Sequence, residues 1–92
     1  MSATERKTME SCLKSYEGYV DFWSDDVGDT EQLYKLRDHI HDRLSELSAS
    51  QKDALRKTDD KLLKLASDNR ESQSWDVVML RKTSVLIKDE RY

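Results

Sequence analysis

Apolar residues recur at intervals of three and four positions along most of this chain. Such spacing is typical of amphipathic α-helices, because residues three or four apart share one helix face. It predicts helices over about residues 3–24, 30–47 and 51–67. The positions expected to face the interior are Met9, Leu13, Tyr16, Val20 and Trp23 in the first helix, Leu33, Leu36, Ile40, Leu44 and Leu47 in the second, and Leu55, Leu62, Leu65 and Ala66 in the third.

Residues suited to helix ends separate these segments. Gly28 suits the end of the first helix, since glycine adopts backbone conformations that other residues avoid. Asp29 is a favourable N-cap for the second helix, and Ser50 with Asp53 gives a capping pattern for the third. The short connection predicts that the second and third helices are antiparallel neighbours. In the polar loop 68–74, one serine is expected to cap the last helix.

The last segment, residues 75–88, is apolar on two sides. As a helix it has a second apolar ridge formed by Val77, Leu80 and Ile87. Its first face contains Trp75, Val78, Met79, Val85 and Leu86. Its β-branched residues leave a β-hairpin as the alternative, with a turn at Arg81 and Lys82. That turn lacks the Gly, Asn or Asp that short hairpins prefer, so the helix is favoured.

The composition agrees with an all-α fold. The chain of 92 residues contains no proline and only two glycines, which disfavours turn-rich sandwiches and barrels. Only 36% of the residues are hydrophobic and 38% are charged, so the core must be thin. We expect a single domain over residues 1–92 that forms a compact antiparallel bundle of three or four helices.

Charge and cysteine content limit the classes of function. There are 16 basic and 19 acidic residues, and this net charge of -3 makes nucleic acid an unlikely partner. The longest apolar run, residues 77–80, is far too short to span a membrane. The N-terminal residues do not resemble a secretory signal, and the single Cys12 has no partner for an internal disulfide. We therefore expect a cytoplasmic protein with no membrane association.

An aromatic cluster near the end of the first helix is the first candidate contact site. Phe22 falls well away from the core face, and Tyr19 falls at its edge. Exposed aromatic residues are frequent anchors of protein interfaces. Asp25 and Asp26 follow them and are expected to attract a basic partner.

The second candidate contact site is the ridge of Val77, Leu80 and Ile87. A helix that is apolar on two sides is either central to a bundle or shared with a partner. The ridge therefore predicts a homo-oligomer, most simply a dimer, with a central helix in a monomer as the alternative.

No residue pattern points to a metal or another cofactor. His39 and His41 are two positions apart, so they face different directions on a helix and cannot share one ion. The acidic segment from Asp25 to Glu31 lacks the ligand order of a calcium loop. Neither a glycine-rich phosphate loop nor a nucleophile elbow is present in the sequence.

Asp59 lies near the apolar stripe of the third helix. If it is buried, it needs a basic or hydrogen-bonding partner. The sequence favours a boundary position, at which Asp59 would pair with Lys52, Lys61 or Lys64.

These patterns favour a small non-enzymatic protein–protein interaction module. It would be an inhibitor, adaptor or immunity-type protein, from bacteria or a mobile element, and would cover a partner's surface with an apolar patch that has an acidic rim. The alternative is a dimeric nucleic-acid-binding regulator that uses the third helix, the most basic part of the chain. The basic residues of that helix are Lys52, Arg56, Lys57, Lys61 and Lys64.

Overall fold

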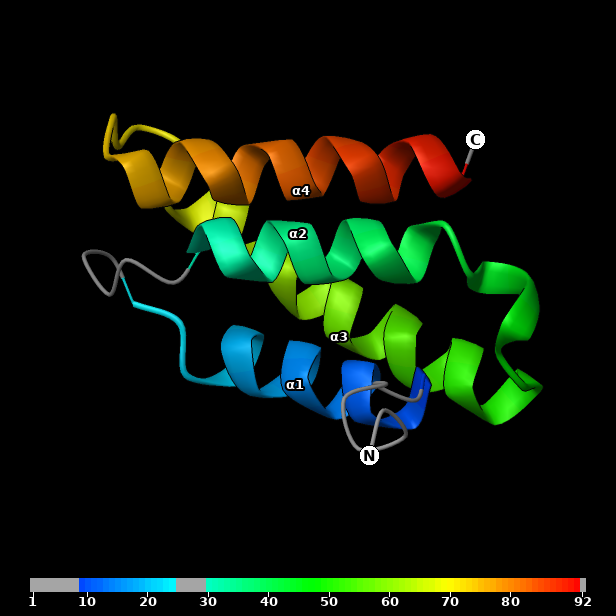
Figure 1. Ribbon diagram of the computed structural model, residues 1–92. Coiled ribbons are helices and arrows are strands. Elements are labelled where there is room, and N and C mark those ends of the chain that lie inside the picture. Colours follow the sequence, from blue (N-terminus) through cyan, green and yellow to red (C-terminus); the bar gives the residue numbers. More distant parts are fainter. Residues whose placement is uncertain (1–8, 25–29, 92) are drawn as a thin grey trace.

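The computed structural model describes residues 9–24 and 30–91, and every regular element in these two stretches is a helix (Figure 1). The elements are α1 (Met9–Asp21), α2 (Thr30–His41), the short 3₁₀ helix η2 (Leu44–Glu46), α3 (Ala49–Asp68) and α4 (Trp75–Arg91). The predicted all-α bundle is confirmed. The β-hairpin alternative for the last segment is wrong. The capping roles predicted for Gly28 and Asp29 lie outside the described residues.

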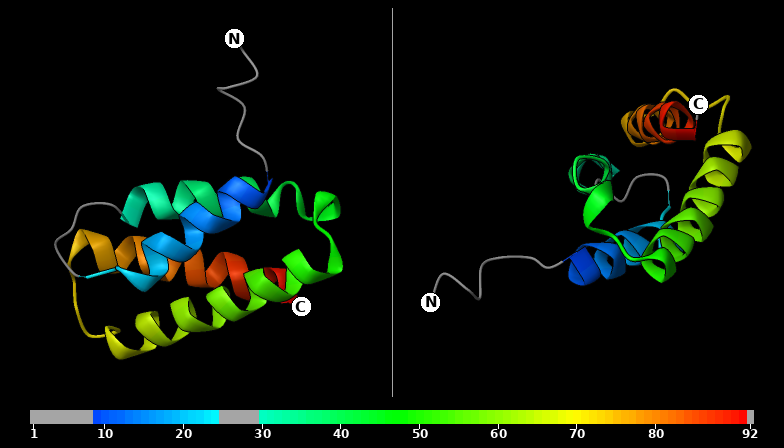
Figure 2. Two further views of the ribbon diagram at one scale, coloured as in Figure 1. Left: turned by 90° about the horizontal axis from the view of Figure 1, so that it is seen from below. Right: turned by 90° about the vertical axis from the view of Figure 1, so that its right-hand side faces the viewer.

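The four α-helices pack in the spatial order α1, α2, α4, α3, with α3 returning to α1 (Figure 2). The pairs α1/α2 and α3/α4 run antiparallel (Figure 1). Helices α2 and α3 also run in opposite directions, but they lie diagonally across the bundle. The prediction that they are packed neighbours is therefore wrong. The physical reason is the connection over residues 42–48, in which η2 carries the chain across the end of the bundle instead of turning it tightly.

Serine side chains begin two of the helices. The Ser48 hydroxyl accepts a hydrogen bond from the Gln51 backbone N–H at 3.2 Å, and the Gln51 side chain accepts one from the Ser48 N–H at 2.8 Å. This reciprocal pair is a capping box, and it starts α3 two residues before the expected cap at Ser50. The Val77 N–H donates to the Ser74 hydroxyl at 3.2 Å. One serine of the polar loop thus caps α4, as predicted.

The core contains most of the apolar residues predicted for it. Its buried members are Cys12, Leu13, Tyr16, Val20, Leu33, Ile40, Leu47, Leu55, Leu62, Ala66, Leu80 and Ile87. None of the helices in the described stretches is both long and apolar enough to cross a bilayer.

The apolar ridge of α4 that was expected at an interface is buried, and part of the other apolar face is exposed. Val77, Leu80 and Ile87 have no exposed surface, whereas Trp75 is 60% exposed and Val85 58% exposed. Helix α4 packs mainly against α2 and α3, and part of its other side remains in solvent. The compact ridge is buried, and on the other face Trp75 and Val85 are exposed whereas Met79 is buried.

Candidate functional site

A buried polar network joins all four α-helices at the centre of the bundle. Each helix supplies at least one side chain. They include Tyr16 from α1, Arg37 from α2, Asp59 from α3 and Glu90 from α4. Arg37 is fully buried and Asp59 is 3% exposed. Charged side chains normally lie in water. Their burial here therefore requires that they form hydrogen bonds and ion pairs with one another.

Arg37 is the centre of this network. Its Nε and one Nη each donate to a different oxygen of Asp59, both at 2.9 Å. The same Nη donates to Glu90 at 2.6 Å. The Arg37 guanidinium carbon lies 5.9 Å from the centre of the Tyr16 ring, within the range of a cation–π contact. A bidentate arginine–carboxylate pair has a fixed geometry, so it sets the relative position of α2 and α3.

The tyrosine and the two acids complete the network. The Tyr16 hydroxyl donates to Asp59 at 2.6 Å. His41 Nδ1 lies 2.6 Å from the second oxygen of Glu90. Glu90 therefore ties the last turn of α4 to two residues of α2.

The environment shifts the ionisation of these groups. Burial raises the pKa of Tyr16, and the negative charge of Asp59 raises it further. Burial opposes the charged form of Arg37, but hydrogen bonds to Asp59 and Glu90 outweigh this and raise its pKa. Burial also opposes the charged form of Glu90, yet the hydrogen bonds from Arg37 and His41 hold its pKa below the ordinary value. The carboxylate of Glu90 and the guanidinium of Arg37 are thus stabilised as ions.

The expected boundary position of Asp59 is wrong. It is buried, and its partners are Arg37 and Tyr16 instead of the lysines of α3. Arg37 was not among the predicted site residues, although the sequence contains one signal for it. Arg37 lies four residues after Leu33 and three before Ile40, so it shares the core face with both.

A second polar chain lies where α1 ends and α2 and α4 begin. The Trp23 indole N–H donates to the Thr30 hydroxyl at 2.8 Å, and that hydroxyl donates to Asp76 at 2.8 Å. Thr30 is fully buried and Asp76 is 6% exposed. This chain of hydrogen bonds holds Trp23, just after α1, against the first turns of α2 and α4.

Phe22 is the most exposed large apolar residue of the described chain, with 85% of its surface in solvent. Its off-face position agrees with the sequence prediction. Tyr19 is partly buried and packs against the core. Asp25 and Asp26 lie outside the described residues.

Val77, Leu80 and Ile87 lie on one face of α4, as predicted, but that face is in the interior of the bundle. A partner has no access to these three side chains while the bundle is closed. The interface expected there is therefore corrected to a core position. The exposed apolar residues of α4 are Trp75 and Val85, and the sequence had placed both of them on its other face.

The basic residues of α3 are exposed and share their surface with acids. Lys57 pairs with Asp53 at 3.2 Å, and Lys61 pairs with Asp21 of α1 at 3.1 Å. These pairs reduce the excess of positive charge available to a phosphate backbone.

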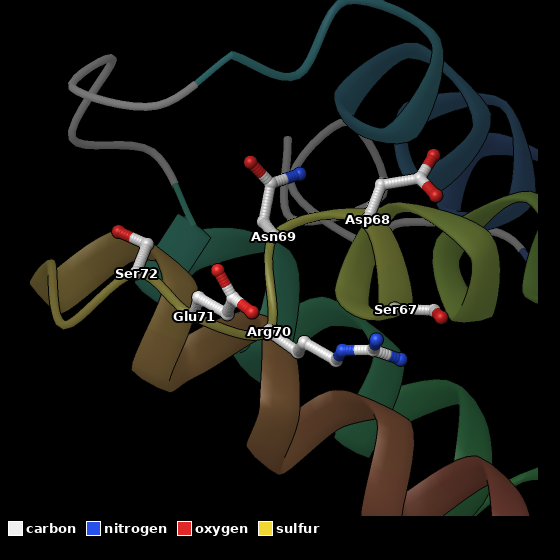
Figure 3. Close-up of a pocket in the computed structure, with 6 residues that line it drawn as sticks. All are labelled: Ser67, Asp68, Asn69, Arg70, Glu71 and Ser72. Carbon is white, nitrogen blue, oxygen red and sulfur yellow. The ribbon is translucent and has the colours of Figure 1, made fainter.

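An open pocket lies at the loop between α3 and α4. Its lining residues are Ser67, Asp68, Asn69, Arg70, Glu71 and Ser72. Figure 3 shows Asp68 and Asn69 pointing to one side and Arg70 to another, so the polar groups do not converge on one point. Arg81 of α4 donates to the carbonyl oxygens of Arg70 and Ser72, which fastens the loop to the helix.

Comparison with known proteins finds no matching family model, no matching curated sequence and no matching solved structure.

Proposed function

We propose that this chain is a small non-enzymatic interaction module that covers part of another protein's surface through Phe22. Such a module would act as an inhibitor, an adaptor or an immunity-type protein. The observation that supports the proposal is the 85% exposure of a phenylalanine in a chain whose surface is otherwise mostly polar. Large aromatic side chains contribute strongly to binding when a partner removes them from water.

The backbone that presents Phe22 is well fixed. The Phe22 N–H donates to the Gly18 carbonyl at 3.0 Å, which continues the hydrogen bonding of α1. The next residue, Trp23, points inward and is tied through Thr30 to Asp76. An anchor held in place before binding loses less conformational entropy when the partner arrives.

The surroundings of Phe22 suit a partner with an apolar pocket and a basic rim. Tyr19 lies three residues earlier, in the last turn of α1, and is partly buried. Asp25 and Asp26 follow in sequence, and we propose that their charge steers a basic partner toward this end of the bundle. We place the activity in the cytoplasm, in keeping with the single cysteine.

The alternative, a nucleic-acid-binding regulator, has less support. Its reading helix would be α3, where Lys57 and Lys61 already pair with carboxylates. Binding of mixed DNA at low salt that is lost in the Lys57→Glu, Lys61→Glu variant would favour the regulator over the module.

Affinity capture from the source organism tests the proposal. The tagged chain should retain one protein partner in stoichiometric amount after nuclease treatment. Phe22→Asp should abolish that capture while leaving the helical content unchanged, since Phe22 contributes little to the core. Gln32→Asp adds the same charge at another exposed position and should bind normally. Equal capture by both variants would refute a partner site at Phe22.

A further inference from the structure

The outer face of α4 carries a regular stripe that no part of the described chain covers. The stripe consists of Trp75, Val78, Lys82, Val85 and Asp89, with spacings of three, four, three and four. Trp75 and Val85 are 60% and 58% exposed, Val78 is half-buried, and the two charged residues are exposed. Helix α4 forms one edge of the molecule, so this face is open to solvent (Figures 1 and 2).

The alternation of three and four is the spacing by which one helix packs along another. In coiled coils these positions form the contact seam, and each side chain inserts between side chains of the facing helix. The stripe on α4 runs over most of the helix and keeps this spacing throughout. The length and spacing of the stripe therefore match the packing of a second helix along α4.

The distribution of size and charge along the stripe selects the orientation of that second helix. In a parallel pair of α4 helices, Lys82 would face Lys82 and Asp89 would face Asp89, and like charges in contact are unfavourable. An antiparallel pair with its two-fold axis at the level of Leu80 places Trp75 against Val85 of the second copy. In that pair Lys82 faces Val78 of the second copy, where its aliphatic stem covers the valine and its ammonium group reaches water.

Charges at the ends of α4 agree with the same orientation. Lys88 and Asp89 lie near the end of α4, and Arg70 and Glu71 lie in the loop before its start, all exposed. The antiparallel pair brings the end of one α4 beside the loop of the other. Lys88 can then face Glu71 of the second copy, and Asp89 can face Arg70 of the second copy.

We propose that two copies of this chain associate through the outer faces of their α4 helices, antiparallel, with Trp75 of each copy packed on Val85 of the other. The stripe does not include Phe22, and this proposal does not depend on the proposed function. A contact between single helices lies at the small end of protein interfaces, below about 1,200 Å² in total. The dimer is therefore reversible and depends on concentration.

Sedimentation of the full chain over a range from micromolar to millimolar concentration tests the association. The mass should rise from one copy to two. Val85→Asp and Trp75→Lys should each raise the dissociation constant at least about tenfold. Gln32→Asp, at an exposed position on α2, and Phe22→Asp should leave the dissociation constant unchanged. Circular dichroism should show the same helical content for every variant, because the substituted side chains are outside the core.

Mixing the two stripe variants tests the orientation. In an antiparallel pair of one Trp75→Lys chain with one Val85→Asp chain, the introduced opposite charges face each other and the second Trp75–Val85 contact is intact. The mixture should therefore form dimers at concentrations where each variant alone is monomeric. A parallel pair would bring no opposite charges together, and failure of the mixture to associate would overturn the antiparallel arrangement.

Two results would overturn the proposal as a whole. One is a native chain that stays monomeric at millimolar concentration. The other is a dimer whose dissociation constant is unaffected by both Trp75→Lys and Val85→Asp. Neither result would bear on capture of a partner through Phe22, so the failures of the two proposals are distinguishable.

Discussion

Arg37 and Asp59 form a bidentate ion pair although their helices lie at opposite corners of the bundle. The pair spans the centre, with both hydrogen bonds at 2.9 Å. The helix backbones of α2 and α3 make few contacts of their own, so this pair is a direct link between them. Buried ion pairs add little net stability compared with apolar packing, but loss of one partner leaves a charge buried without compensation.

The first prediction concerns this pair. Arg37→Met should lower the free energy of unfolding by about 3–5 kcal/mol, because it leaves the Asp59 carboxylate buried without a cationic partner. Asp59→Leu should cost less, because Arg37 keeps its ion pair with Glu90. The double variant should lose less than the sum of the two single losses, since it removes both charges together. Urea denaturation followed by circular dichroism gives all three values. Single losses below about 1 kcal/mol would show that the pair is solvated and not buried.

The second prediction concerns the ionisation of Tyr16. Burial and the neighbouring Asp59 charge raise its pKa above the ordinary value of 10.0. Its stabilising contribution is therefore complete below that value and is lost only as pH rises toward the higher folded pKa. In an alkaline titration followed by tyrosinate absorbance, one of the four tyrosines should ionise only when the protein unfolds.

The variant Tyr16→Phe provides the control for that titration. It should lack the late ionisation and should unfold more easily by about 1–3 kcal/mol, because Asp59 loses a hydrogen-bond donor. Ionisation of all four tyrosines together in the folded native chain would show that the hydroxyl of Tyr16 is accessible to water.

Much of the helical architecture followed from the periodicity of apolar residues. The spacing predicted three of the four helices, because a helix that packs on others must repeat its buried positions every three or four residues. For the last segment the helix was only favoured over a hairpin, because the residues at the possible turn are unsuited to one. It did not find their spatial order. That order depends on the path of residues 42–48, which contain a short 3₁₀ helix without a sequence signal strong enough to separate it from a continued α-helix.

The candidate site was less accessible from sequence. The burial of Asp59 depends on Arg37, which is distant in the chain and meets it only when the helices are assembled. The side of α4 that is buried was equally undetermined, because both sides carry similar apolar residues. The exposure of Phe22 was predictable, since on the helix expected over residues 3–24 its position is far from the stripe that packs inward.

The third prediction concerns acid stability. Burial opposes ionisation of Glu90, but Arg37 and His41 hold its pKa below the ordinary value of 4.5. A carboxylate with a lowered folded pKa contributes stability above its unfolded value, and this is lost as pH falls through the folded value. The native chain should therefore lose stability below about pH 5. Glu90→Gln should lose less on acidification, and Asp42→Asn, at an exposed position between α2 and η2, should follow the native chain. Identical acid profiles for Glu90→Gln and the native chain would show that protonation of Glu90 does not cause the loss of stability.

The fourth prediction compares the two sides of α4. Leu80 is fully buried and Val85 is 58% exposed on the same helix. Leu80→Ala should lower the free energy of unfolding by about 2–5 kcal/mol, because it removes core contacts and leaves a cavity. Val85→Ala should change it by no more than about 0.5 kcal/mol. Both are measured by urea denaturation at low micromolar concentration, where self-association does not contribute.

The same comparison extends to charged substitutions. The double variant Leu80→Asp, Ile87→Asp places two carboxylates in the core and should not fold, whereas Val85→Asp should keep the native helical content. A double variant that folds normally would mean that α4 is rotated, with the ridge of Val77, Leu80 and Ile87 on the surface. The stripe through Trp75 and Val85 would then belong to the core, and the interface proposed for it would move to the ridge.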